Sequence, residues 1–205
     1  MTTTAFPNGQ VMVSTALTIP QMNIALQAWT LQVLGMAPTN YSRVRVDWPT
    51  QGQPFNSLPS EDVCYIQCVT RDTNYARVRD KDLAGTDPVT ETWNYTRGWQ
   101  VAWCAYGPRA TDDLRLVKSA LFLDYFNDAL NASNLYPLPD PPEPTYTPEN
   151  IDAEWWARAD FHVDLYEAVT EVLTTPVGGY VKSVEVKVYD ESPADPAADF
   201  TVTKS

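Results

Sequence analysis

The sequence predicts an α+β fold, with a mostly antiparallel sheet of about five strands and helices packed on one face. Three observations lead to this prediction. A long aromatic strand pattern covers residues 93–106, an amphipathic helical pattern follows it up to Leu130, and runs of neighbouring strand patterns are interrupted by single helices. Such an order is typical of sheets whose strands pair with their sequence neighbours.

The N-terminal segment predicts an arm followed by a helix. Residues 1–17 are small and polar, and we expect them to form a flexible arm. Thr18 is a suitable N-cap for a helix over about 19–35, with Pro20 in its first turn. Apolar residues recur through this segment, and Gly35 ends it.

Two strand patterns and a long connection follow the helix. Residues 42–48 alternate between apolar and charged side chains and predict a half-buried strand. Residues 63–70 are apolar on both faces, which is typical of a central strand. Residues 71–92 are charged and poor in large apolar side chains, so we expect a long hairpin loop that is mobile or engaged with a partner.

The strand over residues 93–106 carries large rings on one face and small or polar groups on the other. This alternation is the period of a β-strand. Trp99 and Trp103 belong to the aromatic set, so we expect them to point into the interface between the sheet and the following helix. Their expected neighbours there are Val117 and Leu121.

A short break separates this strand from the helix. Gly107 and Pro108 end the strand, because proline has no N–H to donate to a ladder. Thr111 is the predicted N-cap, and the carboxylates of Asp112 and Asp113 complement the positive helix N-terminus. A cation site at this acidic pair is the alternative, but the helix terminus alone accounts for both charges.

The C-terminal third predicts extended structure. Residues 136–148 contain six prolines, so an extended bridge over the surface is predicted, with a ligand for an SH3-type domain as the alternative. Residues 154–170 alternate and predict a second long strand, although 167–173 could turn helical. A final strand is predicted over 180–189. The acidic segment 190–205 is rich in proline and alanine and predicts a disordered or partner-seeking tail.

The length of 205 residues suits one domain, so we expect a single α+β domain over residues 1–205. Its arms and loops are the segments 1–17, 71–92, 136–148 and 190–205.

The charge balance argues against binding to nucleic acids, and the lack of a long apolar run argues against a membrane span. The chain has 14 Lys and Arg against 26 Asp and Glu, a net charge of −12. Binding through phosphates requires clustered cations. An acidic surface can still face DNA without binding it, and repulsion is then useful. We expect no membrane span, because no apolar run approaches about 20 residues.

One cluster has the composition of a catalytic site. Asp160, His162 and Asp164 project from one face of the predicted strand. A general base needs a nucleophile or a metal within reach, and the sequence contains no second histidine and no recognised hydrolase or protease motif. We therefore predict a protein that is not an enzyme, with no catalytic residues.

The three cysteines predict packing and no metal chemistry. Cys64, Cys68 and Cys104 form an odd set without CxxC spacing, and the first two share a strand face. Small buried thiols in a reducing compartment are the simpler interpretation, because a metal site needs more ligands. We predict no metal-binding residue, no cofactor-binding residue and no cofactor.

Three segments carry a resemblance to a known family. They are residues 61–65, residues 92–116 and residues 158–167, in the family's order. Through them the chain resembles the tail terminator, or neck terminator, proteins of long-tailed bacteriophages. The proline-rich bridge and the acidic tail have no counterpart that we can match.

This resemblance implies a structural virion protein. Its subunits are expected to form a homo-oligomeric ring, a hexamer, that caps the phage tail tube, stops its polymerisation and joins the tail to a head-completion or connector protein. DNA would pass through the lumen without specific binding, and no membrane would be involved. The protein would be assembled in the host cytoplasm and reside in the tail or neck of the virion.

Other functions stay open from the sequence. Another head–tail connector or a minor tail protein is the nearest alternative. A second is an aromatic-rich module for glycans or peptides, which would be monomeric and carry an exposed aromatic groove. The third is a hydrolase that uses Asp160 and His162.

Overall fold

A computed structural model describes residues 1–7, 9–46, 57–74, 77–85, 88–176, 183–187 and 199–203. Over these residues the chain is mostly sheet, with 45% in strands and 22% in helices. The helices are α1 (Ile19–Val33), α2 (Ala110–Ala120) and α3 (Asp124–Asn131). The strands are β1 (Thr2–Ala5), β2 (Val11–Ser14), β3 (Val44–Val46), β4 (Val63–Arg71), β5 (Arg79–Ala84), β6 (Val89–Tyr106), β7 (Leu135–Pro137), β8 (Thr145–Tyr146), β9 (Glu149–Ile151), β10 (Glu154–Trp156), β11 (Arg158–Thr175), β12 (Ser183–Lys187) and β13 (Asp199–Thr203).

Nine strands form one mixed sheet. Its main order is β1-β2-β11-β6-β4-β3, with β5 added to β6, and β7 and β8 added to β11. The β3–β4 pair is parallel, and the other pairs are antiparallel. The predicted fold class, an α+β domain with a mostly antiparallel sheet of about five strands and helices on one face, is therefore wrong. Segments that were expected to be arms and loops pair with the long strands and enlarge the sheet.

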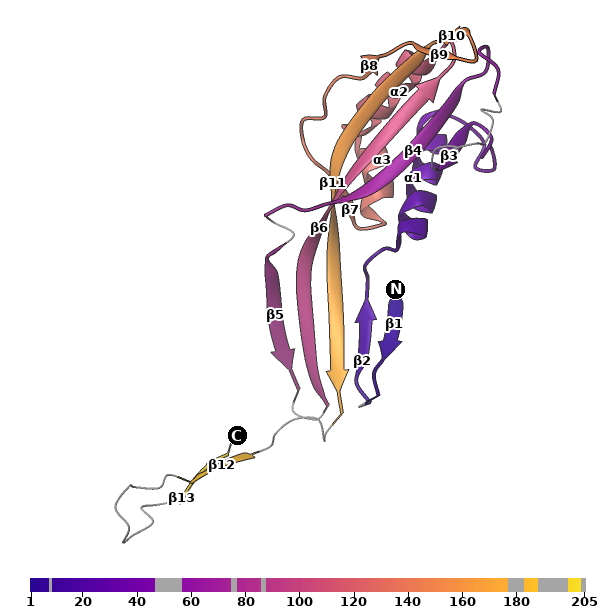
Figure 1. Cartoon of the computed structure of the whole chain (residues 1–205). Coiled ribbons are helices and arrows are strands. Elements are labelled where there is room, and N and C mark those ends of the chain that lie inside the picture. Colours follow the sequence, from indigo (N-terminus) through magenta and orange to yellow (C-terminus); the bar gives the residue numbers. More distant parts are fainter. Residues whose placement is uncertain are drawn as a thin grey trace.

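The two central strands determine the shape of the molecule. β6 and β11 have 18 residues each and pair along their whole length, so each is roughly 60 Å long at about 3.3 Å per residue. Figure 1 shows the helices beside one half of these strands, while the other half projects away from them. We call this projecting half the strand arm. It consists of β1, β2, β5, residues 89–96 of β6 and residues 168–175 of β11.

The N-terminal residues belong to this arm. The prediction of a flexible arm over 1–17 is corrected, because β1 and β2 form a hairpin and β2 pairs with β11. Threonine predominates in β1 and valine in β2, and their branched side chains suit a pleated sheet. The predicted first helix is confirmed. Thr18 caps α1 through a capping box in which Gln21 is the reciprocal partner.

The predicted loop over 71–92 is also corrected. It contains β5, which pairs with the first residues of β6, and β6 begins at Val89 rather than Trp93. The charged side chains of β5 concealed this strand, although its two cations pair with carboxylates across the sheet. The ammonium group of Lys81, for example, lies 2.8 Å from a carboxylate oxygen of Glu91.

The C-terminal long strand extends further than predicted. Residues 167–173 do not turn helical, because each pairs with β6 and β11 continues to Thr175. The predicted strand over 154–170 is divided at Ala157 into β10 and β11. Within 136–148, β7 and β8 are extended and pair with the edge of β11, whereas the bridge predicted over the whole segment stays a prediction.

The helix predicted after β6 is two helices, α2 and α3. The predicted N-cap Thr111 is wrong, because α2 has Arg109 as its N-cap residue and no side-chain cap. The backbone N–H of Arg109 instead donates to Asp62 Oδ1 at 2.9 Å. This contact comes from a loop far away in the sequence, so the local pattern gave no sign of it.

The remaining predicted strands are found in part. β4 lies between β3 and β6, which confirms the central strand predicted over 63–70. Of the strand predicted over 42–48, residues 44–46 form β3, residues 42 and 43 lie in the turn before it, and residues 47 and 48 are outside the described residues. β12 lies within the final strand predicted over 180–189. In the predicted tail, 190–205, the described segment β13 pairs with β12, so that part is not disordered.

We call the helices and the part of the sheet outside the strand arm the body. The main core lies in this body, between the sheet and the three helices. Trp99 and Trp103, each 1% exposed, lie in the same buried cluster as Val117 and Leu121, as predicted. A smaller cluster on the other face of the sheet contains Tyr65, Cys104, Tyr106 and Trp156.

Candidate functional site: the strand arm and its junction with the body

The register of the strand arm divides its side chains between two faces. Residues that are paired across antiparallel strands point to the same side of a sheet. One continuous row across all five strands contains Thr2, Ser14, Glu171, Trp93 and Lys81. The next row points to the opposite side and contains Thr3, Val13, Val172, Thr92 and Asp82.

The second of these rows belongs to what we call the threonine face. This face carries small or β-branched side chains and no aromatic side chain among the described residues. Asp80 and Asp82 are its only charged groups among the described residues. Its members are Thr3, Ala5, Val11, Val13, Asp80, Asp82, Ala84, Thr90, Thr92, Asn94, Thr96, Ala168, Thr170, Val172 and Thr174. The face is therefore polar or aliphatic, with negative charge and no cation.

The first row belongs to the opposite face, which we call the aromatic face. There the Arg79 guanidinium lies 4.4 Å from the centre of the Tyr95 ring, and the Lys81 ammonium lies 4.8 Å from the centre of the Trp93 ring. The Tyr95 hydroxyl donates to Glu171 Oε1 at 2.7 Å. Burial, followed by this hydrogen bond, raises the pKa of Tyr95 to about 12. The cations of β5 are thus folded back over their own sheet.

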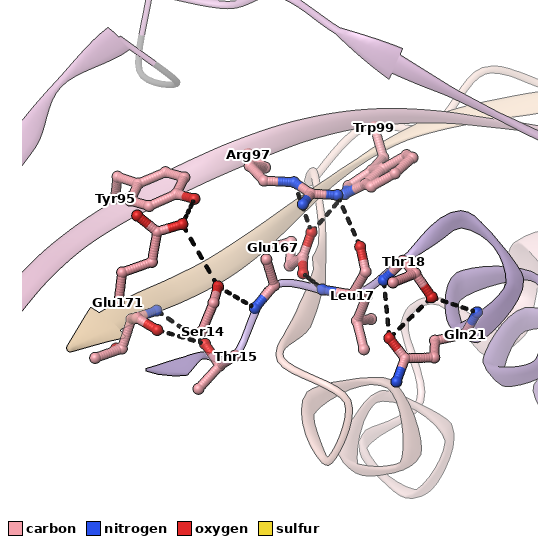
Figure 2. A network of polar contacts seen from close by, with 12 residues as sticks. Ser14, Thr15, Leu17, Thr18, Gln21, Tyr95, Arg97, Trp99, Glu167 and Glu171 are labelled. Atoms are coloured by element: carbon pink, nitrogen blue, oxygen red, sulfur yellow. Dashed lines mark hydrogen bonds and ion pairs between the residues drawn. The ribbon is translucent and has the colours of Figure 1, made fainter. Parts of the chain in front are cut away.

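A buried carboxylate marks the place where the arm joins the body. Glu167 is 0% exposed. Figure 2 shows it at the centre of a network: its oxygens accept from Trp99 Nε1 at 2.7 Å and from the Leu17 backbone N–H at 2.6 Å, and Arg97 Nε lies 3.1 Å away. Arg97 also donates to the Leu17 carbonyl at 3.1 Å. These contacts fasten the segment between β2 and α1 to both long strands.

Sequence reasoning missed Glu167. A signal was present, because Glu167 continues the buried alternation of Phe161, Val163 and Leu165, and Val169 follows it. A carboxylate at a buried position requires a charged partner or several hydrogen-bond donors. The partners come from β6 and from the residues before α1, so only the tertiary structure identifies them.

The cluster of Asp160, His162 and Asp164 does share one face of β11, as predicted, and His162 is exposed. Its carboxylates are paired with arginines. Asp160 Oδ1 accepts from Arg158 Nε at 3.0 Å, and Asp164 forms an ion pair with Arg71. In the part of the chain that the structure describes, no group of three or more His, Cys, Asp or Glu side chains is placed to hold a metal ion.

The cysteines are packing residues. Cys64 and Cys104 are buried, and burial raises the pKa of both thiols. Cys68 is half-buried and packs against the same core cluster as Cys64, which confirms that these two share a strand face.

Asp112 and Asp113 both lie in the first turn of α2. Asp113 Oδ1 is 3.1 Å from Arg109, and burial raises the pKa of the Asp113 carboxyl. Asp112 Oδ1 is 3.7 Å from Arg115.

Most described tryptophans fill the interior of the protein, which argues against a glycan-binding groove. Trp29, Trp99, Trp103 and Trp156 are each 5% exposed or less, whereas Trp155 is 72% exposed. A groove that stacks sugars would need several rings turned outward on one surface.

Among the described residues, none of the helices is both long and apolar enough to cross a membrane.

Comparison with models of known protein families gives a match. A family model described as phage neck terminator protein matches residues 21–197. None of the curated proteins matches the chain. The matched residues include the body and most of the strand arm, and β1 and β2 precede them.

Proposed function

Because the chain belongs to the phage neck terminator protein family, we propose that it forms a hexameric ring at the neck of the virion, where it caps the tail tube, stops its polymerisation and joins the tail to a head-completion protein. The family membership agrees with the resemblance found in the sequence. It makes the chain a structural component of the phage neck, a role that requires no catalytic group.

The threonine face of the strand arm is the observation that carries this proposal furthest. A ring at the neck needs a lumen through which DNA passes without being held. Lysine and arginine retain DNA by neutralising phosphates and releasing counterions. A face with Asp80 and Asp82, and without cations among its described residues, repels the phosphate backbone instead. We infer that the threonine face lines the lumen.

The aromatic face suits the outer side of such a lumen. Its cations, Arg79 and Lys81, pair with Glu171 of β11 and Glu91 of β6, and the rings of β6 lie beneath them. The network around Glu167 then holds this sheet at a fixed position relative to the helices. The helical body remains available for contacts with the tail tube and the connector.

Ring formation and tail length test the proposed function directly. Purified chain should form particles of six subunits, alone or on addition of tail-tube protein. Tails assembled without it should exceed their normal length. Mass photometry of the purified chain measures the number of subunits. Electron microscopy measures the length of tails from a phage that lacks the gene, with and without complementation. A monomer under all conditions contradicts the proposal. A ring without any effect on tail length would favour another head–tail connector.

Two lysine substitutions test the lumen assignment. Ala84 and Leu83 are exposed neighbours at the end of β5 that point to opposite faces. Ala84→Lys should place six new cations around the lumen, retain DNA and slow its ejection, because each cation adds a phosphate contact. Leu83→Lys adds the same charge on the aromatic face and is the matched control. The readout is the rate of DNA ejection from complemented particles, measured with a DNA-binding dye. Equal rates for both variants would contradict the assignment.

A further inference from the structure

The strand arm ends in two different open edges. Among the described residues, β1 pairs only with β2, and β5 pairs only with β6. Both strands are exposed along their whole length. The outer edge of such a strand presents unpaired N–H and C=O groups, which are a template for pairing with another chain.

β1 lacks the features that usually protect an edge. Its sequence is Thr-Thr-Thr-Ala, without charge or proline. β5 is charged, but its two cations are already engaged. Arg79 and Lys81 lie over rings of β6 and pair with Glu171 and Glu91, so they point across their own sheet instead of outward from its edge.

The directions of the two edge strands fit a rotational assembly. Four antiparallel pairs lead across the arm from β1 to β5: β1–β2, β2–β11, β11–β6 and β6–β5. Four reversals restore the original direction, so β1 and β5 run in the same direction. Figure 1 shows both arrows pointing toward the tip of the arm. A rotation about an axis along the strands therefore places β1 of one copy parallel to β5 of the next. Such a contact uses two different surfaces, which is the requirement for a closed ring.

The register of the two edges matches as well. β1 lies level with the last four residues of β5 in the same sheet, because the rows run through all five strands: Thr2 with Lys81, Thr3 with Asp82, Thr4 with Leu83 and Ala5 with Ala84. Joining the edges therefore continues each face into the next copy. The threonine face, with Thr3 beside Asp82, would become one unbroken surface.

We propose that the β1 edge of one subunit pairs in parallel with the β5 edge of a second copy of this chain, and that this pairing closes the strand arms into a barrel. The inference rests on the proposed function, which supplies the ring. Six arms of five strands, spaced by about 4.8 Å, give a barrel roughly 45 Å across between opposite backbones, before strand tilt widens it. Such a lumen is wider than a DNA duplex. β1 lies outside the residues that the family model matches, so the inference concerns this chain itself.

Cysteine cross-linking tests the pairing. Within one subunit β1 and β5 are separated by three strands, about 19 Å, and a disulfide requires Cα atoms within about 7 Å. A disulfide between a Thr3→Cys site and an Asp82→Cys site can therefore form only between copies. Oxidation of this double variant should give a ladder of covalent oligomers up to the hexamer on a non-reducing gel. Because closure of a barrel can stagger the strands, Asp80→Cys and Ala84→Cys are tested as further partners for Thr3→Cys.

Two controls make the result specific. The unsubstituted chain contains the same three native cysteines and should give no ladder. Thr3→Cys combined with Leu83→Cys places the thiols on opposite faces and should cross-link at least tenfold less. All five substituted positions are exposed, so the variants should fold.

The outcomes separate this inference from the proposed function. A ladder with any same-face pair, and at least tenfold less cross-linking with the opposite-face pair, supports edge pairing. Rings and normal tails without a ladder, or equal ladders for both faces, overturn the pairing and leave the proposed function intact. Failure of the unsubstituted chain to form rings, even with tail-tube protein, would overturn both.

Discussion

Replacing Trp103 with alanine is expected to lower the free energy of unfolding by about 3–5 kcal/mol. The indole is 1% exposed and lies between two other rings, with centroid distances of 5.6 Å to Phe161 and 6.1 Å to Trp29. Its Nε1–H donates to Thr30 Oγ1 at 2.9 Å, and Thr30 is itself fully buried. Truncation removes the ring contacts, leaves a cavity and deprives a buried hydroxyl of its partner.

Trp155 is the matched control for this prediction, because it is 72% exposed. Trp155→Ala should change the stability by no more than about 0.5 kcal/mol. Urea unfolding of both variants, followed by circular dichroism, gives the comparison. Equal stabilities for the two variants would mean that Trp103 does not lie in a packed core.

Glu167→Ala is expected to be about as destabilising, by roughly 3–5 kcal/mol. The substitution leaves the Arg97 guanidinium, the Trp99 indole N–H and the Leu17 N–H without their acceptor at a place where water does not reach Glu167. Glu167→Gln keeps one acceptor oxygen and should cost less. Loss of the Glu167 carboxylate in Glu167→Ala should also release the segment before α1. The Leu17 amide should then exchange its hydrogen faster, which hydrogen-exchange measurements would detect.

Glu143→Ala serves as the control, because that carboxylate is 77% exposed and pairs with Lys118 at the surface. Its cost should stay below about 1 kcal/mol. A double variant, Glu167→Ala with Arg97→Ala, should be less unstable than the sum of the single variants, because both residues belong to one network. Strict additivity, or a cost no larger than that of Glu143→Ala, would refute the role assigned to Glu167.

Much of the body could be predicted from the sequence, because its signals are local. Thr18 and Gln21 define the start of α1, and the alternation of rings in β6 correctly places Trp99 and Trp103 in the core. The resemblance that was based on residues 61–65, 92–116 and 158–167 led to the family that the comparison found. Each of these signals depends on the order of side chains along a single segment.

The strand arm could not be predicted in this way. Residues 1–17 and 71–92 are small, polar or charged, which locally favours an arm or a loop. They become strands because the long pair of β6 and β11 offers unpaired backbone groups at both of its edges. For the same reason 167–173 stays in a strand, since pairing with β6 outweighs a local preference for a helix.

The sequence by itself therefore determined the N-cap of α1, the central position of β4, the core face of β6 and the family of the protein. The tertiary structure decided the extent of the sheet, the burial of Glu167 and the two faces of the arm. The physical reason is the same in each case. Alternation and capping depend on neighbours along the chain, whereas the threonine face is assembled from five strands whose register is set by hydrogen bonds between distant segments.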